Sequence, residues 1–458
     1  MPKRRVPVSR RKRGSKTVSR RKSAVTPIRL RRKAAKTVPI GKKAAKPIRL
    51  QRKAAETVPL QKKAAETADR WTGAFLDRLR SQGDALADET LKLILKDGEN
   101  AGMQALFREM DSNDDLPPSR QFPHLKKFFR MTDGLPPGID LDRIRRGEDI
   151  FRAHVFESAI VLLMRSLPEG YAAPNLAIIL NISGQLESHT FKRLLATLQM
   201  VINVTTSRGF QPGGKAVITA QKLRLLHAGI RRLTEKYRPG YSRKYGVPAN
   251  MEDMLVTMMG FSYILLMGLR TLNVGLTPAQ EEDCFYLWRV YTLMMGIHPE
   301  GHPGSDEYLP VNIEDAARFY EAYKRRHYVE APDNPDGVSL AAADLRMLSA
   351  RVPRLLRLFG LGVIPRIYMR ELMGDEACAR IGIRPVPGHT LMKWAVMHIH
   401  AILRPIEDAD ASRLGRMGEM LFQDMISKAY NGEVTFTVPT TMRELKNIVR
   451  ESKNPAAH

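Results

Sequence analysis

From Trp71 onward, apolar side chains recur every three or four residues, the spacing that places them on one face of an α-helix. An early run of this kind has apolar side chains at Ile150, Phe151, Phe156, Ile160 and Leu163. Later runs predict helices near 188–205, 216–236, 250–270, 277–296, 312–326, 340–360, 388–403 and 409–430. This pattern predicts an all-α protein with one large helical domain over residues 71–458.

Helix-start signals agree with these boundaries. Thr277, followed by Pro278 and Gln280, supplies an N-cap, a proline at the first helical position and a capping-box partner. Thr441 and Glu444 repeat the capping box before a last helix. Only residues 434–438 have the composition of a strand.

The positive charge of the chain is confined to its first 70 residues. They hold 25 Lys and Arg against three acidic side chains, whereas residues 71–458 hold 49 basic and 45 acidic ones. From Arg32 the segment repeats every ten residues, and Pro39, Pro47 and Pro59 interrupt each short helical stretch. With so little apolar surface, residues 1–70 are expected to form a disordered basic arm.

Three interpretations of the arm remain open. It could be a solvated tail, or it could attach the protein to a polyanion such as nucleic acid or an anionic membrane surface. It could also be a targeting peptide, although no apolar segment follows the twin-arginine-like stretches at Arg10 and Arg20. We therefore expect a cytoplasmic protein, associated with the nucleoid or a membrane surface if the arm binds there. Deleting the arm tests polyanion binding.

The most apolar run, Met254–Leu269, is short for a membrane span and follows Glu252 and Asp253 directly. We expect it to be a buried central helix. The two cysteines, Cys284 and Cys378, cannot form a disulfide framework, and no CxxCH, Walker or GxGxxG motif is present.

Two predicted helices carry polar side chains in stripes. Arg224, His227 and Arg231 share one helix face, beside the small residues Ala228 and Gly229 that would admit a bulky partner. An imidazole between two guanidinium groups suits haem, with His227 binding iron and the arginines pairing with propionates. Taken alone, the pattern also fits a helix with two solvated arginines.

The second stripe is formed by His189, Arg193 and Thr197. Such a donor-rich face could hold dioxygen opposite a haem, and it equally fits the solvent side of an amphipathic helix.

Together the two stripes belong to an ordered set of residues between about Gly147 and Pro310. The other members are Ser166-Leu167-Pro168, Tyr171-Ala172, Gly184, Pro212-Gly213-Gly214, Gly246-x-Pro248, Glu252-Asp253-Met254, Trp288-Arg289 and Gly296-Ile297. This set resembles the catalytic domain of the rubber oxygenases (latex clearing proteins), shared with the oxygenase of mycophenolic acid biosynthesis. The resemblance implies an all-helical fold around non-covalent haem b, with His227 as the proximal iron ligand and Arg224 and Arg231 anchoring or orienting the haem.

The chain also departs from that family. Ala196 stands where rubber oxygenases have a lysine, and residues 175–180 contain no carboxylate to match the family's acidic residue. The resemblance implies that Arg193 and Thr197 position dioxygen and that Ala196 leaves the ligand side open.

The sequence therefore predicts a haem-dependent oxygenase that uses dioxygen on an apolar, lipid-like substrate, an unsaturated one being the narrower option. An alternative is a non-catalytic haem sensor or carrier tethered by the arm. A third option is a helical scaffold without haem.

Overall fold

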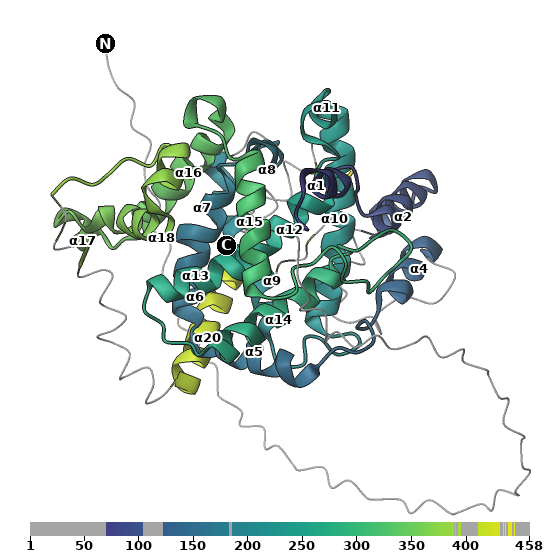
Figure 1. Cartoon of the computed structure of the whole chain (residues 1–458), viewed down its shortest axis with the longest axis horizontal. Helices are drawn as coiled ribbons and strands as arrows, with labels where there is room; N and C mark the ends of the chain where they lie inside the picture. The colour runs from purple at the N-terminus through teal and green to yellow at the C-terminus, as the bar shows by residue number, and fades with distance from the viewer. Residues whose placement is uncertain are drawn as a thin grey trace, which may run out of the picture. The chain divides into compact units, whose positions relative to one another are not determined.

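The computed structural model describes residues 70–103, 122–182, 186–388 and shorter stretches between 390 and 444. The basic arm predicted for residues 1–70 lies outside the described residues except for Arg70, and so does most of the helix predicted at 388–403. The described part is built from helices and contains no strand (Figure 1). The all-α prediction is therefore confirmed, whereas residues 434, 436 and 438 do not form the predicted strand.

In chain order the α-helices are α1 (Gly73–Arg80), α2 (Ala85–Lys96), α4 (Pro123–Thr132), α5 (Leu141–Ala153), α6 (Val155–Val161), α7 (Leu167–Gly170), α8 (Pro174–Leu180), α9 (Leu186–Thr205), α10 (Lys215–Tyr237), α11 (Tyr241–Tyr245), α12 (Met251–Phe261), α13 (Tyr263–Thr271), α14 (Pro278–Met294), α15 (Ile313–His327), α16 (Pro335–Arg351), α17 (Arg354–Leu358), α18 (Ile364–Arg380) and α20 (Ala411–Tyr430). Several of them begin and end close to the predicted runs, namely α9, α10, α14, α15 and α20, whereas others, such as α18, were not predicted. Shorter helical turns are the π-helix η2 (Leu162–Ser166) and the 3₁₀-helices η3 (Ala331–Asp333) and η4 (Leu361–Val363).

The capping box predicted at Thr277 is complete, whereas the one predicted at Thr441 forms only in part, because the Glu444 carboxylate accepts from the amide of Thr440 and not of Thr441. The Thr277 hydroxyl accepts from the Gln280 amide at 3.3 Å, and the Gln280 side chain accepts from the Thr277 amide at 2.8 Å. The Thr441 hydroxyl accepts from the Glu444 amide at 3.1 Å. These bonds satisfy backbone N–H groups that the first turn of a helix leaves without partners.

Two helices are shorter than the sequence predicts. The run at 250–270 breaks at Ser262, whose hydroxyl donates to the Met258 carbonyl at 2.9 Å and competes with the regular helix bonding. The run at 340–360 starts earlier, at Pro335, and α16 ends before Pro353 because a residue that precedes proline disfavours helical geometry.

The core surrounds α12, α13 and α14, near the centre of Figure 1. Every residue of α12 except Thr257 is buried. By length and composition, residues 251–271 could cross a membrane, yet 67 % of that window is buried within the protein. These helices thus form the central core that the sequence predicts. Trp71 fixes the start of the domain to α15, because its indole N–H donates to the Asp315 carboxylate at 2.9 Å.

Candidate functional site

Arg224, on the predicted haem-binding face of α10, is held by a carboxylate of the protein itself. Its Nε and Nη2 donate to the two oxygens of Asp84 at 2.6 and 3.0 Å, and both side chains are buried. Burial would raise the pKa of Asp84, but the Arg224 guanidinium holds that pKa below its ordinary value. Gly296, with φ +80°, lies against the pair, and a Cβ there would come within 2.8 Å of Arg224 Nε.

Arg231, two turns further along α10, makes the equivalent contact. Its Nε donates to the oxygens of Asp88 at 2.8 and 3.0 Å, and its Nη1 donates to the Ala249 carbonyl at 3.3 Å. Arg224 and Arg231 therefore share a face of α10, as their spacing predicts, and both reach α2, which lies beside α10 in Figure 1. The anions that they contact here are Asp84 and Asp88, whereas the contact with propionates remains a prediction.

His227 lies on α10 between these two ion pairs and differs from its neighbours. Burial and the nearby charge of Arg231 lower its pKa to about 4, so the imidazole is neutral at physiological pH. The side chain keeps some accessible surface, and among the described residues it has no hydrogen-bonding partner. A neutral imidazole with a free lone pair, on a helix fixed on both sides, has the chemistry of a metal ligand.

Gly229, the second small residue after His227, packs against another part of the chain. Gly229 faces the segment 438–440, and a Cβ on it would lie 2.8 Å from the Pro439 carbonyl oxygen and 3.0 Å from Val438 Cγ1. Arg232 donates to the Thr440 carbonyl at 3.1 Å. Gly229 therefore permits a close approach to the backbone, as predicted, but the neighbour that approaches it is the segment 438–440 of the same chain.

The second stripe lies on α9, which packs against α10. Arg193 donates weakly, at 3.4 Å in each case, to the Tyr171 hydroxyl and to the Leu180 carbonyl. The Thr197 hydroxyl donates to the carbonyl of Arg193 at 3.1 Å. Within the described part of the chain, no hydrogen bond or ion pair joins either residue to His227. The side chain of His189 lies outside the described residues.

A carboxylate does stand near Arg193, but it comes from α16. Asp344 is 1 % exposed and accepts a hydrogen bond from the Tyr171 hydroxyl at 2.5 Å, the same hydroxyl that Arg193 approaches. Burial raises the pKa of Asp344 to about 6, although Arg193 and Tyr171 counteract the shift. Asp344 lies far in sequence from residues 175–180, where the family resemblance would place an acidic residue. The sequence does contain a sign of its role. Asp344 is an acidic residue on the same helix face as Leu340, Ala343 and Leu348, which are apolar and buried.

Residues 175–180, where the family resemblance would place a carboxylate, contain the amide side chain of Asn175 instead. Asn175 donates to Asp253 and to the Tyr323 hydroxyl, at 2.5 and 2.8 Å, in a buried polar cluster. Burial raises the pKa of Asp253 to about 7. This cluster joins α8, α12 and α15, which is a structural role.

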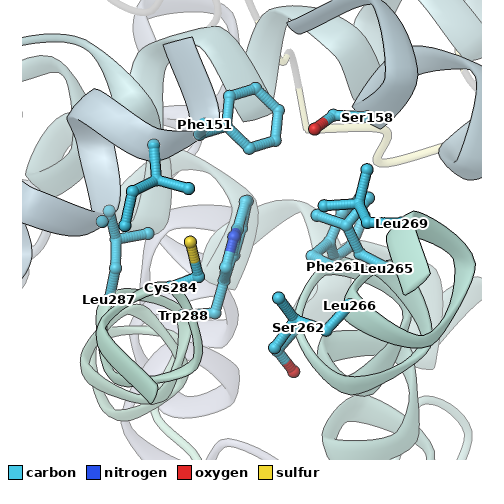
Figure 2. Close-up of a pocket in the computed structure, with 12 residues that line it drawn as sticks. Phe151, Ser158, Phe261, Ser262, Leu265, Leu266, Leu269, Cys284, Leu287 and Trp288 are labelled. Atoms are coloured by element: carbon cyan, nitrogen blue, oxygen red, sulfur yellow. The ribbon is translucent and has the colours of Figure 1, made fainter. Parts of the chain in front are cut away.

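A small apolar cavity lies between α5, α6, α13 and α14 (Figure 2). It measures about 10 Å³, room for a single water-sized molecule. Trp288, Cys284 and Phe261 contribute to its wall, and the buried hydroxyl of Ser158, which also lines it, has no partner in the described structure. Burial raises the pKa of Cys284 to about 12, so its thiol stays protonated.

The chain is similar to known proteins in both sequence and fold. Residues 151–402 match the family model described as ER-bound oxygenase mpaB/B′/rubber oxygenase, catalytic domain. A rubber oxygenase of Streptomyces sp. (strain K30) is 22 % identical over 237 residues, which are 51 % of this chain and 56 % of the relative. The chain thus matches little more than half the length of that relative.

A solved structure of latex clearing protein in the closed state superposes with a TM-score of 0.57 at 19 % identity. The match covers 81 % of this chain and 90 % of the other. At that identity the likeness concerns the fold.

Proposed function

This chain belongs to the family of the ER-bound oxygenase mpaB/B′ and rubber oxygenase catalytic domain, and from that premise we propose that it is a haem b-dependent oxygenase. Its substrate is apolar and lipid-like. The observation that carries the proposal is His227, a neutral imidazole without a hydrogen-bonding partner among the described residues. It lies on a helix that the Arg224–Asp84 and Arg231–Asp88 ion pairs hold in place.

His227 fits the expected role of iron ligand, whereas Arg224 and Arg231 are given a different role from the expected pairing with propionates. A neutral imidazole can bind iron directly, without first losing a proton. Arg224 and Arg231 already contact carboxylates, so their role is to orient α10 and thereby the ring of His227. Haem b, when bound, supplies the iron that activates dioxygen.

The ligand side is assigned to α9. Arg193 carries a fixed positive charge near Tyr171 and Asp344, and Thr197 offers a hydroxyl one turn further along. We assign to these two residues the orientation of dioxygen. Arg193 donates to it directly, whereas Thr197 donates to it only when its hydroxyl turns away from the Arg193 carbonyl. Ala196, which is half-buried and apolar, leaves room for an exogenous ligand where the family has a lysine.

The name of the relative, rubber oxygenase, supports an apolar substrate, because rubber is an apolar polymer. The polymer itself is not assigned to this chain, because the match spans 56 % of that relative. Among apolar molecules, unsaturated ones offer the carbon–carbon double bond that an oxygenase can attack. Dioxygen uptake with alkene-containing lipids would distinguish an oxygenase from a haem carrier.

The test of the cofactor is an absorption spectrum of protein expressed with a haem precursor, before and after reduction by dithionite. A Soret band with near-stoichiometric haem is expected for the parent protein. It should be lost or strongly shifted in His227→Ala and unchanged in His302→Ala, since His302 is exposed. A His227→Ala protein that retains full haem and the parent spectrum would refute the assignment.

The ligand side is tested separately. Arg193→Met and Thr197→Val should keep the haem content of the parent and lower its dioxygen uptake by about tenfold or more, the usual effect of removing a positioned hydrogen-bond donor. Unchanged uptake in both variants would remove α9 from the site while leaving the haem assignment intact.

A further inference from the structure

The segment between α16 and α18 exposes large apolar side chains together with arginines. Leu355 is 65 % exposed, Leu358 83 % and Phe359 73 %, the three highest values among the large apolar side chains of the described residues. Arg354 and Arg357 are exposed beside them. α17 lies at the edge of the domain in Figure 1, and we call residues 353–360 the α17 tip.

The local sequence produces this projection. Pro353 ends α16, and α17 then runs for five residues before Gly360 turns the chain at φ +78°. Leu355 and Leu358 are three residues apart and share one helix face. Arg351, at the end of α16, anchors the base of the tip, because its guanidinium carbon lies 3.4 Å from the ring centre of Phe191 on α9.

The charge of the segment is unusual as well. Residues 345–370 contain six arginines and no Asp or Glu. Of these, Arg354, Arg357 and Arg366 make no ion pair with any described carboxylate. Water solvates exposed apolar side chains of this size poorly, and a neutral partner would offer no counter-charge to the arginines beside them.

We propose that the α17 tip is a docking site for an anionic lipid bilayer. Leu355, Leu358 and Phe359 enter the boundary between headgroups and acyl chains, while Arg354 and Arg357 contact the phosphates. This interaction is independent of the oxygenase chemistry, so it stands or falls on its own test.

Charge complementarity favours a bilayer over the other occupants. The N-terminal 70 residues carry 25 Lys and Arg, so they would be repelled by the arginines of the tip. A second copy of the chain, meeting the first through a two-fold axis, would bring the same arginines together. An anionic headgroup layer satisfies the cations and the apolar tip at once.

The test must separate insertion of the tip from simple attraction of the cationic N-terminal segment. Trp394, the exposed one of the three tryptophans, is first replaced by Phe in every variant, because its own indole could be quenched. The full-length chain carrying Phe359→Trp is then mixed with vesicles of phosphatidylglycerol and phosphatidylcholine whose acyl chains are brominated. Bromine quenches an indole only when it lies at acyl depth. The matched control is Met131→Trp, at another exposed apolar position (58 % exposed). Measurement in about 0.5 M salt weakens attachment through exposed charges alone.

Quenching of Trp at 359, absent at 131 and weaker with phosphatidylcholine alone, is the expected result. Adding Leu355→Ser and Leu358→Ser should lower the fraction bound by about tenfold or more, because each removes an inserted apolar side chain. These residues are exposed, so the thermal melting of the protein should not change.

Three results would overturn the proposal. One is binding to vesicles without quenching at 359, which would assign attachment to the N-terminal segment. Another is equal quenching with zwitterionic vesicles, which would deny the arginines a role. The third is an indole at 359 that is already shielded before vesicles are added, which would mean that a second copy or another part of the chain covers the tip.

Discussion

Arg224 of α10 and Asp84, the N-cap of α2, form a buried bidentate ion pair with distances of 2.6 and 3.0 Å. The same carboxylate accepts from the Ala87 amide at 3.1 Å, so it caps a helix and pairs with a charge. The helix that carries the proposed iron ligand is therefore positioned by α2, which lies outside the family-matched residues 151–402.

Removing Arg224 should strongly destabilise the protein. Arg224→Ala leaves the Asp84 carboxylate buried without a counter-charge, which costs about 3–5 kcal/mol in the free energy of unfolding. Urea unfolding at pH 7 measures the loss, with Lys92→Ala as the control because the Lys92–Glu89 pair is exposed. The pKa of Asp84 lies below its ordinary value, so the contribution of the pair should be present above pH 4 and lost as the pH falls further. A loss below 1 kcal/mol would show that the pair does not hold α10.

His227 should make the haem-free protein acid-sensitive. Its pKa is about 4 in the folded state and near 6.5 in an unfolded chain, so the unfolded state takes up the extra proton between these values. Stability should therefore fall as the pH drops from 6.5 to 4, by about 2–3 kcal/mol from this residue alone. In His227→Gln this part of the decrease should disappear, whereas His302→Gln should behave as the parent. Identical pH profiles for His227→Gln and the parent would mean that the ring is solvated.

Asp344 should act in the opposite direction. Its pKa is raised to about 6, so its stabilising contribution is present below the ordinary value near 4 and lost as the pH rises through 6. Asp344→Asn keeps an acceptor for the Tyr171 hydroxyl and should remove about 2–3 kcal/mol of this alkaline loss. Unfolding at pH 5 and pH 8 measures about half of this loss, about 1–2 kcal/mol, because the rest occurs below pH 5. Glu376→Gln, at an exposed position, is the control. A parallel shift at both pH values would assign the effect to packing.

Gly229 should tolerate no side chain. In Gly229→Ala the new Cβ would meet the Pro439 carbonyl at 2.8 Å, so the segment 438–440 must move, at a cost of about 1–3 kcal/mol. Gly73→Ala is the matched control, because its Cβ would have its nearest neighbour at an ordinary 3.6 Å. A Gly229→Ala protein as stable as the parent would show that this segment is not packed on α10 in solution.

Replacing Ser158, unlike the substitutions above, should not destabilise the protein. Its hydroxyl is fully buried at the apolar cavity without a described partner, so Ser158→Ala should stabilise the protein by about 1 kcal/mol or leave it unchanged. Ser262→Ala, at the same cavity, removes a bond to the Met258 carbonyl and should not stabilise the protein. Destabilisation by Ser158→Ala would reveal a partner such as an ordered water.

The helical architecture and the faces of its helices could be predicted from the sequence alone. Helical periodicity and capping are local, so α9, α10 and α14 begin and end within two residues of their predicted bounds. The shared face of Arg224, His227 and Arg231 follows from helix geometry for the same reason. The break at Ser262 was not predicted, because it depends on the Ser262 hydroxyl donating to the Met258 carbonyl, and the periodicity of apolar residues does not indicate that bond.

Only the tertiary structure decided what those faces contact. Asp84 and Arg224 are 140 residues apart, and Asp344 is 173 residues from Tyr171. Side chains so distant in sequence are brought together by the tertiary fold. The spacing of residues along one helix does not indicate which residue of another helix will contact them. Thus the sequence determined that α10 presents an imidazole between two guanidinium groups. The packing of α2 against α10 decided that both guanidinium groups are held by carboxylates, because opposite charges taken out of water must pair with each other. The imidazole has no such partner among the described residues.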